Sequence, residues 1–337
     1  MRCWTLPAPG SIDALKLVER PDPTPGPRQV LVRVRATALN YRDLITVEGQ
    51  YARAAPKPDL IPLSDGAGEI VAVGPGVSRL KVGDRVAGCF MQKWPGGEID
   101  AAAQASAMGG AIDGMLTELA VLEEDGAVIL PKGLSFEEGA TLPCAAVTAW
   151  HALVEIGQLK AGDTVLVQGS GGVSIFALQF AKTIGARVIA TSSSAAKAER
   201  LKKMGAEAVI DYKATPDWDQ EALRLTGGRG ADVVVEVGGA GTLPRSFLAA
   251  RLGGRIAVIG LLTGPSQVDP MPILRRNLRV QGLYVGSRQM FEAMNRAIEA
   301  NGLKPVIDKV FPFAEAKEAY RHLKSQNHFG KIVIAHS

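Results

Sequence analysis

Between residues 164 and 286, short apolar runs rich in valine and isoleucine alternate with stretches of helical composition. Runs that are apolar on both faces are typical of parallel strands that helices cover on both sides. This alternation constrains the fold more strongly than any other feature of the sequence. It predicts an α/β domain whose sheet has six parallel strands, at 164–168, 187–191, 208–212, 232–238, 255–260 and 279–286.

The chain up to about residue 124 has a different texture. Short alternating strands are separated by glycine and proline turns, and the clearest of them is 29–39, where alternate residues are valine. This pattern predicts a β-rich, barrel-like domain. After the α/β region, the tail is expected to add a helix at about 289–300 and a last strand at 331–335.

The first predicted parallel strand leads directly into a glycine turn. Gly169 allows a sharp turn, and Gly171 allows the backbone to approach a pyrophosphate closely. The N–H groups of Gly172 and Val173 begin a helix, whose dipole favours that anion. Ser174 stands where a third glycine is usual, and it is small enough for close packing of the helix on the strand. We therefore predict a dinucleotide site, the alternative being a glycine-rich turn in another α/β fold.

The end of the second predicted strand indicates which dinucleotide binds. An acidic residue there would hold the ribose 2′-hydroxyl of NAD, but the sequence has Thr191 followed by three serines. Lys197 and Arg200 follow within one helical turn of each other. Hydroxyls and cations suit a 2′-phosphate, so NADP(H) is favoured over NAD(H). Alternatively, Ser192–Ser194 only cap a helix.

Composition excludes several classes of protein. The 337 residues carry a net charge of +4, which is too small and scattered to indicate a nucleic-acid partner. The chain lacks an apolar N-terminal segment and an apolar run of about 18 residues, so we expect neither a secretory signal nor a membrane helix. Three distant cysteines without a CxxC pair suit a reducing compartment. These features together predict a cytoplasmic protein.

Several motifs appear in order along the chain: ALNYRD (38–43), DGAGEIVAVGPGV (65–77), KVGDRVAG (81–88), the glycine turn and HFGKIVI (328–334). In this combination the chain resembles the medium-chain dehydrogenase/reductase superfamily over essentially its whole length. The resemblance implies a GroES-like β-rich catalytic domain and a doubly wound Rossmann coenzyme domain. We expect the catalytic domain at 1–124 and 289–337, and the coenzyme domain at 125–288.

The zinc ligands of the superfamily's alcohol dehydrogenases are largely missing. The positions of the expected cysteine and histidine are Asn40 and Ser64, and only Cys144 matches a ligand position. A catalytic zinc ion needs about three protein ligands, which a single thiolate does not provide. The four-cysteine structural lobe is also absent and is replaced by 92–114. The sequence therefore predicts a metal-free protein in which Cys144 is a small buried residue.

This departure makes the zinc-free quinone oxidoreductase branch the closest resemblance. By that resemblance, Asn40, Asp43 and Tyr51 line the catalytic site, although Asn40 and Asp43 could simply fasten a turn and Tyr51 could be a rim residue. Lys197 and Tyr212 match adenosine-phosphate contacts. Further cofactor contacts are expected from Thr148, Gly169, Ser170, Gly171, Gly172, Val173, Ser192, Ser193, Gly238, Ile259, Gly260, Leu261, Phe329 and Lys331.

Without zinc there is no Lewis acid to make an alcohol a good hydride donor. We therefore expect NADPH-dependent reduction of a quinone or an α,β-unsaturated carbonyl compound, with Asn40 and Tyr51 orienting the carbonyl and the proton source unassigned. Alternatives are an alcohol or aldehyde oxidoreductase and a non-enzymatic NADPH-binding protein. The apolar edge strand at 279–286 predicts a homodimer.

Overall fold

A computed structural model describes residues 1–51, 57–260, 262–264 and 266–336, which form two compact units. One unit contains Met1–Val147 and Gly286–Ser337, and the other contains Thr148–Val285. The first unit extends further along the chain than the expected 1–124. The reason is that helix α3 (Phe136–Ala140) still packs against β3 (Gln29–Leu39) and β4 (Asp65–Val73) of the first unit.

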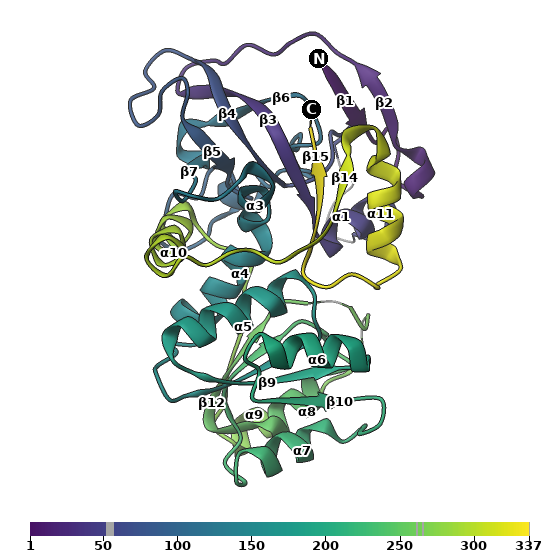
Figure 1. The fold of residues 1–337 in the computed structure, drawn as a ribbon, viewed down its shortest axis with the longest axis vertical. Coiled ribbons are helices and arrows are strands. Elements are labelled where there is room, and N and C mark those ends of the chain that lie inside the picture. The colour runs from purple at the N-terminus through teal and green to yellow at the C-terminus, as the bar shows by residue number, and fades with distance from the viewer. Residues whose placement is uncertain (52–56, 261, 265, 337) are drawn as a thin grey trace. The chain divides into compact units, whose positions relative to one another are not determined.

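The second unit is built on a six-stranded parallel sheet, as the alternating pattern predicts. The strand order is β10-β9-β8-β11-β12-β13. Figure 1 labels β9, β10 and β12 of this sheet. The order reverses between β8 and β11, which creates the switch point where doubly wound folds bind their ligands. The strands are β8 (Thr164–Gln168), β9 (Arg187–Ser192), β10 (Ala208–Asp211), β11 (Ala231–Glu236), β12 (Ala250–Val258) and β13 (Arg279–Gly282).

Helices cover this sheet and bury its apolar side chains. Leu166, Val234 and Ile256 from three neighbouring strands share a core with Trp218 and Phe247 from two helices. The helices of this unit are α5 (Gly172–Ile184), α6 (Ala195–Lys203), α7 (Trp218–Leu225), α8 (Leu243–Ala249) and α9 (Met271–Arg275), and a π-helical segment spans His151–Ile156.

The first unit is β-rich, as expected. Its larger sheet has the order β14-β15-β3-β4-β5-β7, and β6 also pairs with β3. The long strand β3 pairs with β6 near its start and with β15 near its end, which brings the C-terminal strand beside residues 36–39. The remaining strands are β1 (Arg2–Thr5), β2 (Lys16–Glu19), β5 (Arg85–Gly88), β6 (Leu119–Glu123), β7 (Ala127–Ile129), β14 (Ile307–Pro312) and β15 (Lys331–Ala335).

Short helices connect these strands. Ser135 and Glu138 form a capping box at the start of α3, with N–H···O distances of 2.8 and 3.1 Å. The other α-helices are α1 (Tyr41–Val47), α2 (Ala101–Gln104), α4 (Val147–Trp150), which spans the boundary between the units, α10 (Arg288–Asn301) and α11 (Ala316–Lys324). Single turns of 3-10 helix lie at Ile12–Ala14, Glu124–Gly126 and Phe313–Glu315, and a π-helical segment lies at Leu142–Ala146.

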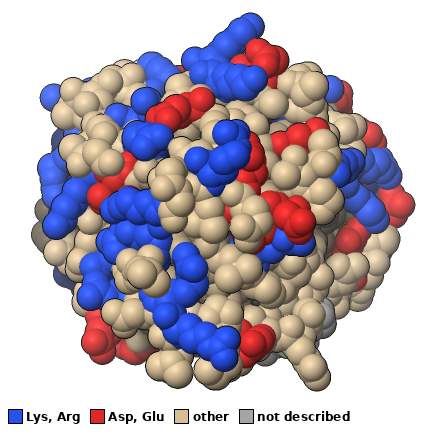
Figure 2. All heavy atoms as spheres, turned by 90° about the horizontal axis from the view of Figure 1, so that it is seen from below, with Lys and Arg blue, Asp and Glu red and all other residues tan. Residues whose placement is uncertain are grey.

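Charges on the surface are mixed in sign. In the face shown in Figure 2, acidic side chains lie among the basic ones. Ion pairs such as Arg187–Glu207 at 2.5 Å and Arg224–Glu221 at 2.6 Å bring charges of opposite sign together on the surface. In the part of the chain that the structure describes, no helix has the length and apolar character needed to cross a membrane.

Candidate functional site

The turn between β8 and α5 has the geometry that a dinucleotide requires. Gly169 has a φ of +72°, and Gly171 is the N-cap residue of α5 with an extended backbone. A Cβ atom added to either glycine would have no neighbour within 4 Å, so the turn borders open space. Ser174 is buried in the first turn of α5 and donates a hydrogen bond to the carbonyl of Gln168 at 2.6 Å. The serine therefore ties the helix to the strand and leaves the turn open.

The predicted 2′-phosphate residues gather at the ends of β9 and β10. The N–H of Tyr212 donates to the carbonyl of Ser192 at 3.2 Å, and Lys197 lies in the first turn of α6. Ser194 accepts a hydrogen bond from the N–H of Lys197 at 3.4 Å, so the serine run does cap this helix. Asp211 lies opposite Ser192 in register. Its carboxylate accepts hydrogen bonds from the N–H groups of Lys213 and Ala214 at 2.9 and 3.2 Å.

A buried carboxylate at the switch point was not predicted from the sequence. Glu236 ends β11, is fully buried, and accepts hydrogen bonds from Gln168 Nε2 at 2.7 Å and Thr242 Oγ1 at 2.6 Å. It also accepts from the N–H groups of residues 238 and 239 and from the hydroxyl of Ser246. The network fixes the loop after β11 against the end of β8, which leads into the glycine turn. The only sequence signal was an acidic residue ending an otherwise apolar strand.

The other expected cofactor residues of the second unit lie at these strand ends. Ile259 and Gly260 donate their N–H groups to the carbonyl of Glu236 at 2.9 and 3.2 Å. A Cβ atom on Gly260 would overlap the carbonyl of Val237, so only glycine fits there. Thr148 is buried at the start of the unit, and Leu261 lies outside the described residues. Ser170 belongs to the link into α5, Val173 lies in the first turn of α5, and the half-buried Ser193 follows β9.

In the first unit, Asp43 fastens the junction between β3 and α1. Its carboxylate accepts the N–H of Asn40 at 2.8 Å and contacts Nη1 of Arg42 at 3.2 Å. The same guanidinium nitrogen donates to the carbonyls of Met108 and Gly109 at 2.8 and 3.0 Å. Complete burial raises the pKa of Asp43 to about 6, against the opposing effect of Arg42. These contacts agree with the alternative interpretation of the sequence, in which Asp43 stabilises the turn between β3 and α1.

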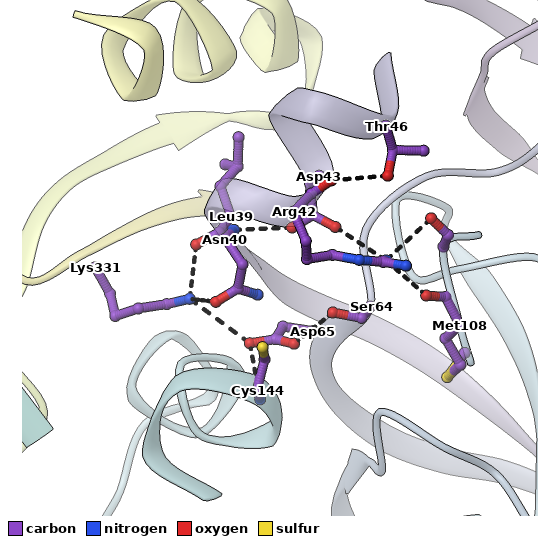
Figure 3. Close-up of polar contacts among 11 residues, drawn as sticks. Leu39, Asn40, Arg42, Asp43, Thr46, Ser64, Asp65, Met108, Cys144 and Lys331 are labelled. Atoms are coloured by element: carbon purple, nitrogen blue, oxygen red, sulfur yellow. Dashed lines mark hydrogen bonds and ion pairs between the residues drawn. The ribbon is translucent and has the colours of Figure 1, made fainter. Parts of the chain in front are cut away.

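Lys331 lies in a buried polar cluster of the first unit. Its ammonium donates to the carbonyl of Leu39 at 2.6 Å and to Oδ1 of Asn40 at 2.5 Å, and it lies 3.6 Å from Oδ2 of Asp65 (Figure 3). Asp65 also accepts from Ser64 Oγ at 2.7 Å and from the N–H of Cys144 at 3.2 Å. Burial raises the pKa of Asp65, and Lys331 opposes that shift. Sequence reasoning placed Lys331 beside the cofactor and did not predict this contact with Asn40.

The two remaining predicted residues of this unit have different surroundings. The ring of Tyr51 lies 5.5 Å from the guanidinium carbon of Arg42, so Tyr51 is beside the polar cluster. Phe329 is buried, with its side chain 1% exposed, and its N–H donates to Asp308 at 3.0 Å. Tyr51 is therefore near the groups that the sequence assigned to the catalytic site.

The cluster is unsuited to zinc. The family's ligand positions, Asn40, Ser64 and Cys144, do come together around Asp65 (Figure 3). Burial raises the pKa of the Cys144 thiol, which disfavours the thiolate that binds a metal, and the Lys331 ammonium lies in the same cluster. Among the described residues, no three His, Cys, Asp or Glu side chains are grouped to hold a metal ion.

Comparisons with known proteins agree with this architecture. Residues 26–132 match the alcohol dehydrogenase GroES-like domain, and residues 172–300 match the zinc-binding dehydrogenase family. A zinc-type alcohol dehydrogenase-like protein of Schizosaccharomyces pombe is 46% identical over 315 residues, which cover 91% of each chain. A solved NAD-dependent alcohol dehydrogenase is 35% identical, with a TM-score of 0.90 and 99% of each chain covered.

More distant relatives carry other names. A mycobacterial protein solved with NADPH is 27% identical, with a TM-score of 0.84 over 99% of each chain. An acryloyl-coenzyme A reductase of Sulfurisphaera tokodaii is 30% identical over 97% of this chain and 98% of its own. A quinone oxidoreductase of Pseudomonas syringae is 29% identical, with a TM-score of 0.83 over 99% of each chain. The chain belongs to the medium-chain dehydrogenase/reductase superfamily of oxidoreductases.

Proposed function

We propose that the protein is a zinc-independent reductase that uses NADPH to reduce a quinone or an α,β-unsaturated carbonyl compound. The observation that carries the proposal is the composition of the cluster around Asp65. The family's ligand positions hold an amide, a hydroxyl and a protonated thiol, and an ammonium lies among them. Hydrogen bonding is the remaining means of polarising a carbonyl, and it suffices for acceptors that are already electron-poor.

The second unit supports the cofactor assignment. The open glycine turn and the N–H groups that begin α5 suit a pyrophosphate, and Lys197 and Tyr212 at the ends of β9 and β10 suit an adenosine 2′-phosphate. Bound NADPH supplies a hydride. A relative solved with NADPH supports this choice, whereas a relative of higher identity is named NAD-dependent. Titration with NADPH and NADH compares the two cofactors directly.

In the first unit, we assign carbonyl orientation to Asn40 and Tyr51. The Asn40 side chain is held by Lys331, and Tyr51 lies beside Arg42. Their task is to hold the acceptor in place and to donate hydrogen bonds to its oxygen as charge develops there. The acryloyl-coenzyme A reductase and quinone oxidoreductase relatives bear names of this chemistry.

Alcohol or aldehyde oxidoreduction is the second candidate, because one relative is named an alcohol dehydrogenase and another a zinc-type alcohol dehydrogenase-like protein. Steady-state oxidation of NADPH over a panel of quinones, enones and aldehydes separates the two. We expect turnover with quinones or enones and little with aldehydes. Turnover confined to aldehydes would favour the second candidate, and binding of NADPH without any turnover would indicate a non-enzymatic protein.

A further inference from the structure

We propose that Lys331 is a positioning residue that orients the Asn40 side-chain amide, so that the amide nitrogen is presented to the substrate carbonyl. The inference rests on the proposed function, because it takes Asn40 as the group that binds the carbonyl oxygen. It gives Lys331 a role inside the first unit, beside the expected contact with the cofactor, which stays a prediction. The contacts around the ammonium carry the argument.

The ammonium determines which amide atom faces it. An asparagine presents an oxygen that accepts and a nitrogen that donates, and the two ends are distinguished by their hydrogen-bond partners. A lysine ammonium only donates, so the Asn40 atom 2.5 Å from it must be the oxygen. The opposite end of the amide is therefore the donor. In Figure 3 this nitrogen points away from Lys331.

Lys331 is itself firmly placed. Its side chain is almost completely buried, and β15 pairs with β3 so that Ile332 lies opposite Leu39. The carbonyl of Leu39 takes a second ammonium proton at 2.6 Å, and Asp65 compensates the charge from 3.6 Å. An ammonium with these partners has little freedom to rotate or leave, so it can hold the amide in one orientation.

The presented nitrogen is an incompletely satisfied donor. Asn40 Nδ2 is buried, and within the described residues no acceptor lies at full hydrogen-bond distance from it. Its interaction with the Asp65 carboxylate helps to lower the pKa of that group and engages at most one of its two protons. A buried donor that is incompletely satisfied is unfavourable and calls for an explanation, of which a functional role is one. A substrate carbonyl oxygen would satisfy it. A fixed donor aimed at a developing negative charge stabilises the transition state without reorganisation.

Kinetics of four variants and one control variant test this coupling. Asn40→Ala removes the donor, so kcat for an enone or quinone should fall about 100-fold, and the KM for NADPH should stay within about twofold. Lys331→Met should lower kcat about 10-fold, and the double variant should be no slower than Asn40→Ala alone. Lys331→Arg, which can still donate to both acceptors, should recover part of the loss. Lys324→Met, which removes an exposed lysine that pairs with Glu48, is the matched control and should leave kcat unchanged.

Two further measurements keep the test decisive. Lys331→Met together with Asp65→Asn avoids an uncompensated buried carboxylate and covers the case in which Lys331→Met fails to fold. The chain has five asparagines, so selective labelling with ¹⁵N-asparagine followed by NMR can resolve the Asn40 amide, which Asn40→Asp identifies by its loss. We expect the two amide proton resonances to shift and to exchange faster when Lys331 is replaced.

Three results would overturn the proposal. Unchanged Asn40 amide resonances in the Lys331 variants would mean that the ammonium does not hold the amide. Losses of kcat that multiply in the double variant would mean that the two residues act independently. A large rise in the KM for NADPH with unchanged kcat would leave Lys331 as a cofactor contact only. If the wild-type protein turns over no substrate, the proposed function fails, and the NMR result still decides the contact between Lys331 and Asn40.

Discussion

Gly171→Ala should weaken dinucleotide binding without destabilising the folded protein. Gly171 has φ −75° and ψ 178°, a conformation that alanine adopts readily, and its added Cβ would meet no atom within 4 Å. Alanine should therefore stabilise the fold by about 0.4 to 1 kcal/mol, because it restricts the unfolded chain. The methyl group would occupy the space through which the backbone approaches a pyrophosphate. We expect NADPH affinity to fall at least about tenfold, which is about 1.4 kcal/mol.

Two other glycines distinguish the effect of backbone strain from the loss of cofactor binding. Gly169 and Gly162 have φ values of +72° and +86°, and neither would place a Cβ within 4 Å of another atom. Alanine at either position should destabilise the fold by about 1 to 2 kcal/mol, because both residues adopt left-handed conformations. Gly162 precedes β8, whereas Gly169 follows it. Only the change at Gly169 should therefore also weaken NADPH binding.

Thermal unfolding and NADPH fluorescence titration of the three variants provide the data. The reasoning fails if Gly171→Ala binds NADPH as tightly as the wild type, because the turn would then not approach the cofactor. It also fails if Gly162→Ala weakens binding as much as Gly169→Ala, because backbone strain alone would then explain the loss. A destabilised Gly171→Ala protein would contradict the open space beside this turn.

Four further predictions follow from the structure. Lys197→Ala should weaken NADPH binding about 10- to 100-fold by titration while NADH binding barely changes, because a charge-assisted contact is worth about 1.5 to 3 kcal/mol; equal losses would make Lys197 structural. The pKa of Asp43 is about 6 in the folded state, against an ordinary value of 3.8. Between these two pH values the folded protein binds more protons at Asp43 than the unfolded chain does. The contribution of Asp43 to the free energy of unfolding therefore falls as the pH rises from about 3.8 to about 6. Urea unfolding at pH 4 and pH 7 should show that Asp43→Asn removes up to about 3 kcal/mol of this fall, and an unchanged pH dependence would contradict the assignment. Mass spectrometry should find less than one equivalent of zinc, and chelators should leave activity intact; loss of both zinc and activity would refute this. Light scattering should give the mass of a dimer, and a mass near 35.5 kDa would exclude one. Leu283 donates its N–H to the carbonyl of Val258 inside the sheet, so strand alternation makes the N–H of Gly282 point to the open edge. Gly282→Pro removes that N–H and should weaken the dimer.

Elements with a local signal were predicted closely from the sequence. The strands at 164–168 and 29–39 have the predicted bounds in the structure, because their apolar patterns are continuous and their ends carry glycine or polar residues. The strand predicted at 279–286 ends at Gly282, because an apolar run such as LYVG can also continue as a loop. Gly169, Gly171 and Ser174 were predictable for the same reason, since strand, turn and helix follow each other in the chain.

Long-range polar contacts were beyond this kind of reasoning. Gln168 and Glu236 are 68 residues apart, and Asn40 and Lys331 are 291 residues apart. β8 and β11 are parallel and end at the same level, whereas the antiparallel β15 begins beside the end of β3. Both meetings depend on strand order and register. A sequence motif suggests that such a residue is functional, as with Lys331, but it does not identify the partner. The tertiary contact between Lys331 and Asn40 is the basis of the proposed positioning role, which resemblance alone did not suggest.

The cluster around Asp65 differs from a zinc site in its charge balance as well as in the two missing ligands. Two buried carboxylates, Asp43 and Asp65, are matched by two cations, Arg42 and Lys331, so the cluster is close to neutral. A divalent ion placed there would add two positive charges beside an ammonium and would need new anionic ligands in a buried setting. Cysteine at residue 40 would supply one such ligand, and the Lys331 ammonium would still oppose the charge of the metal ion. The lysine and the absent cysteine and histidine thus belong to one electrostatic arrangement, in which an ammonium and the amide bonded to it lie among the family's ligand positions.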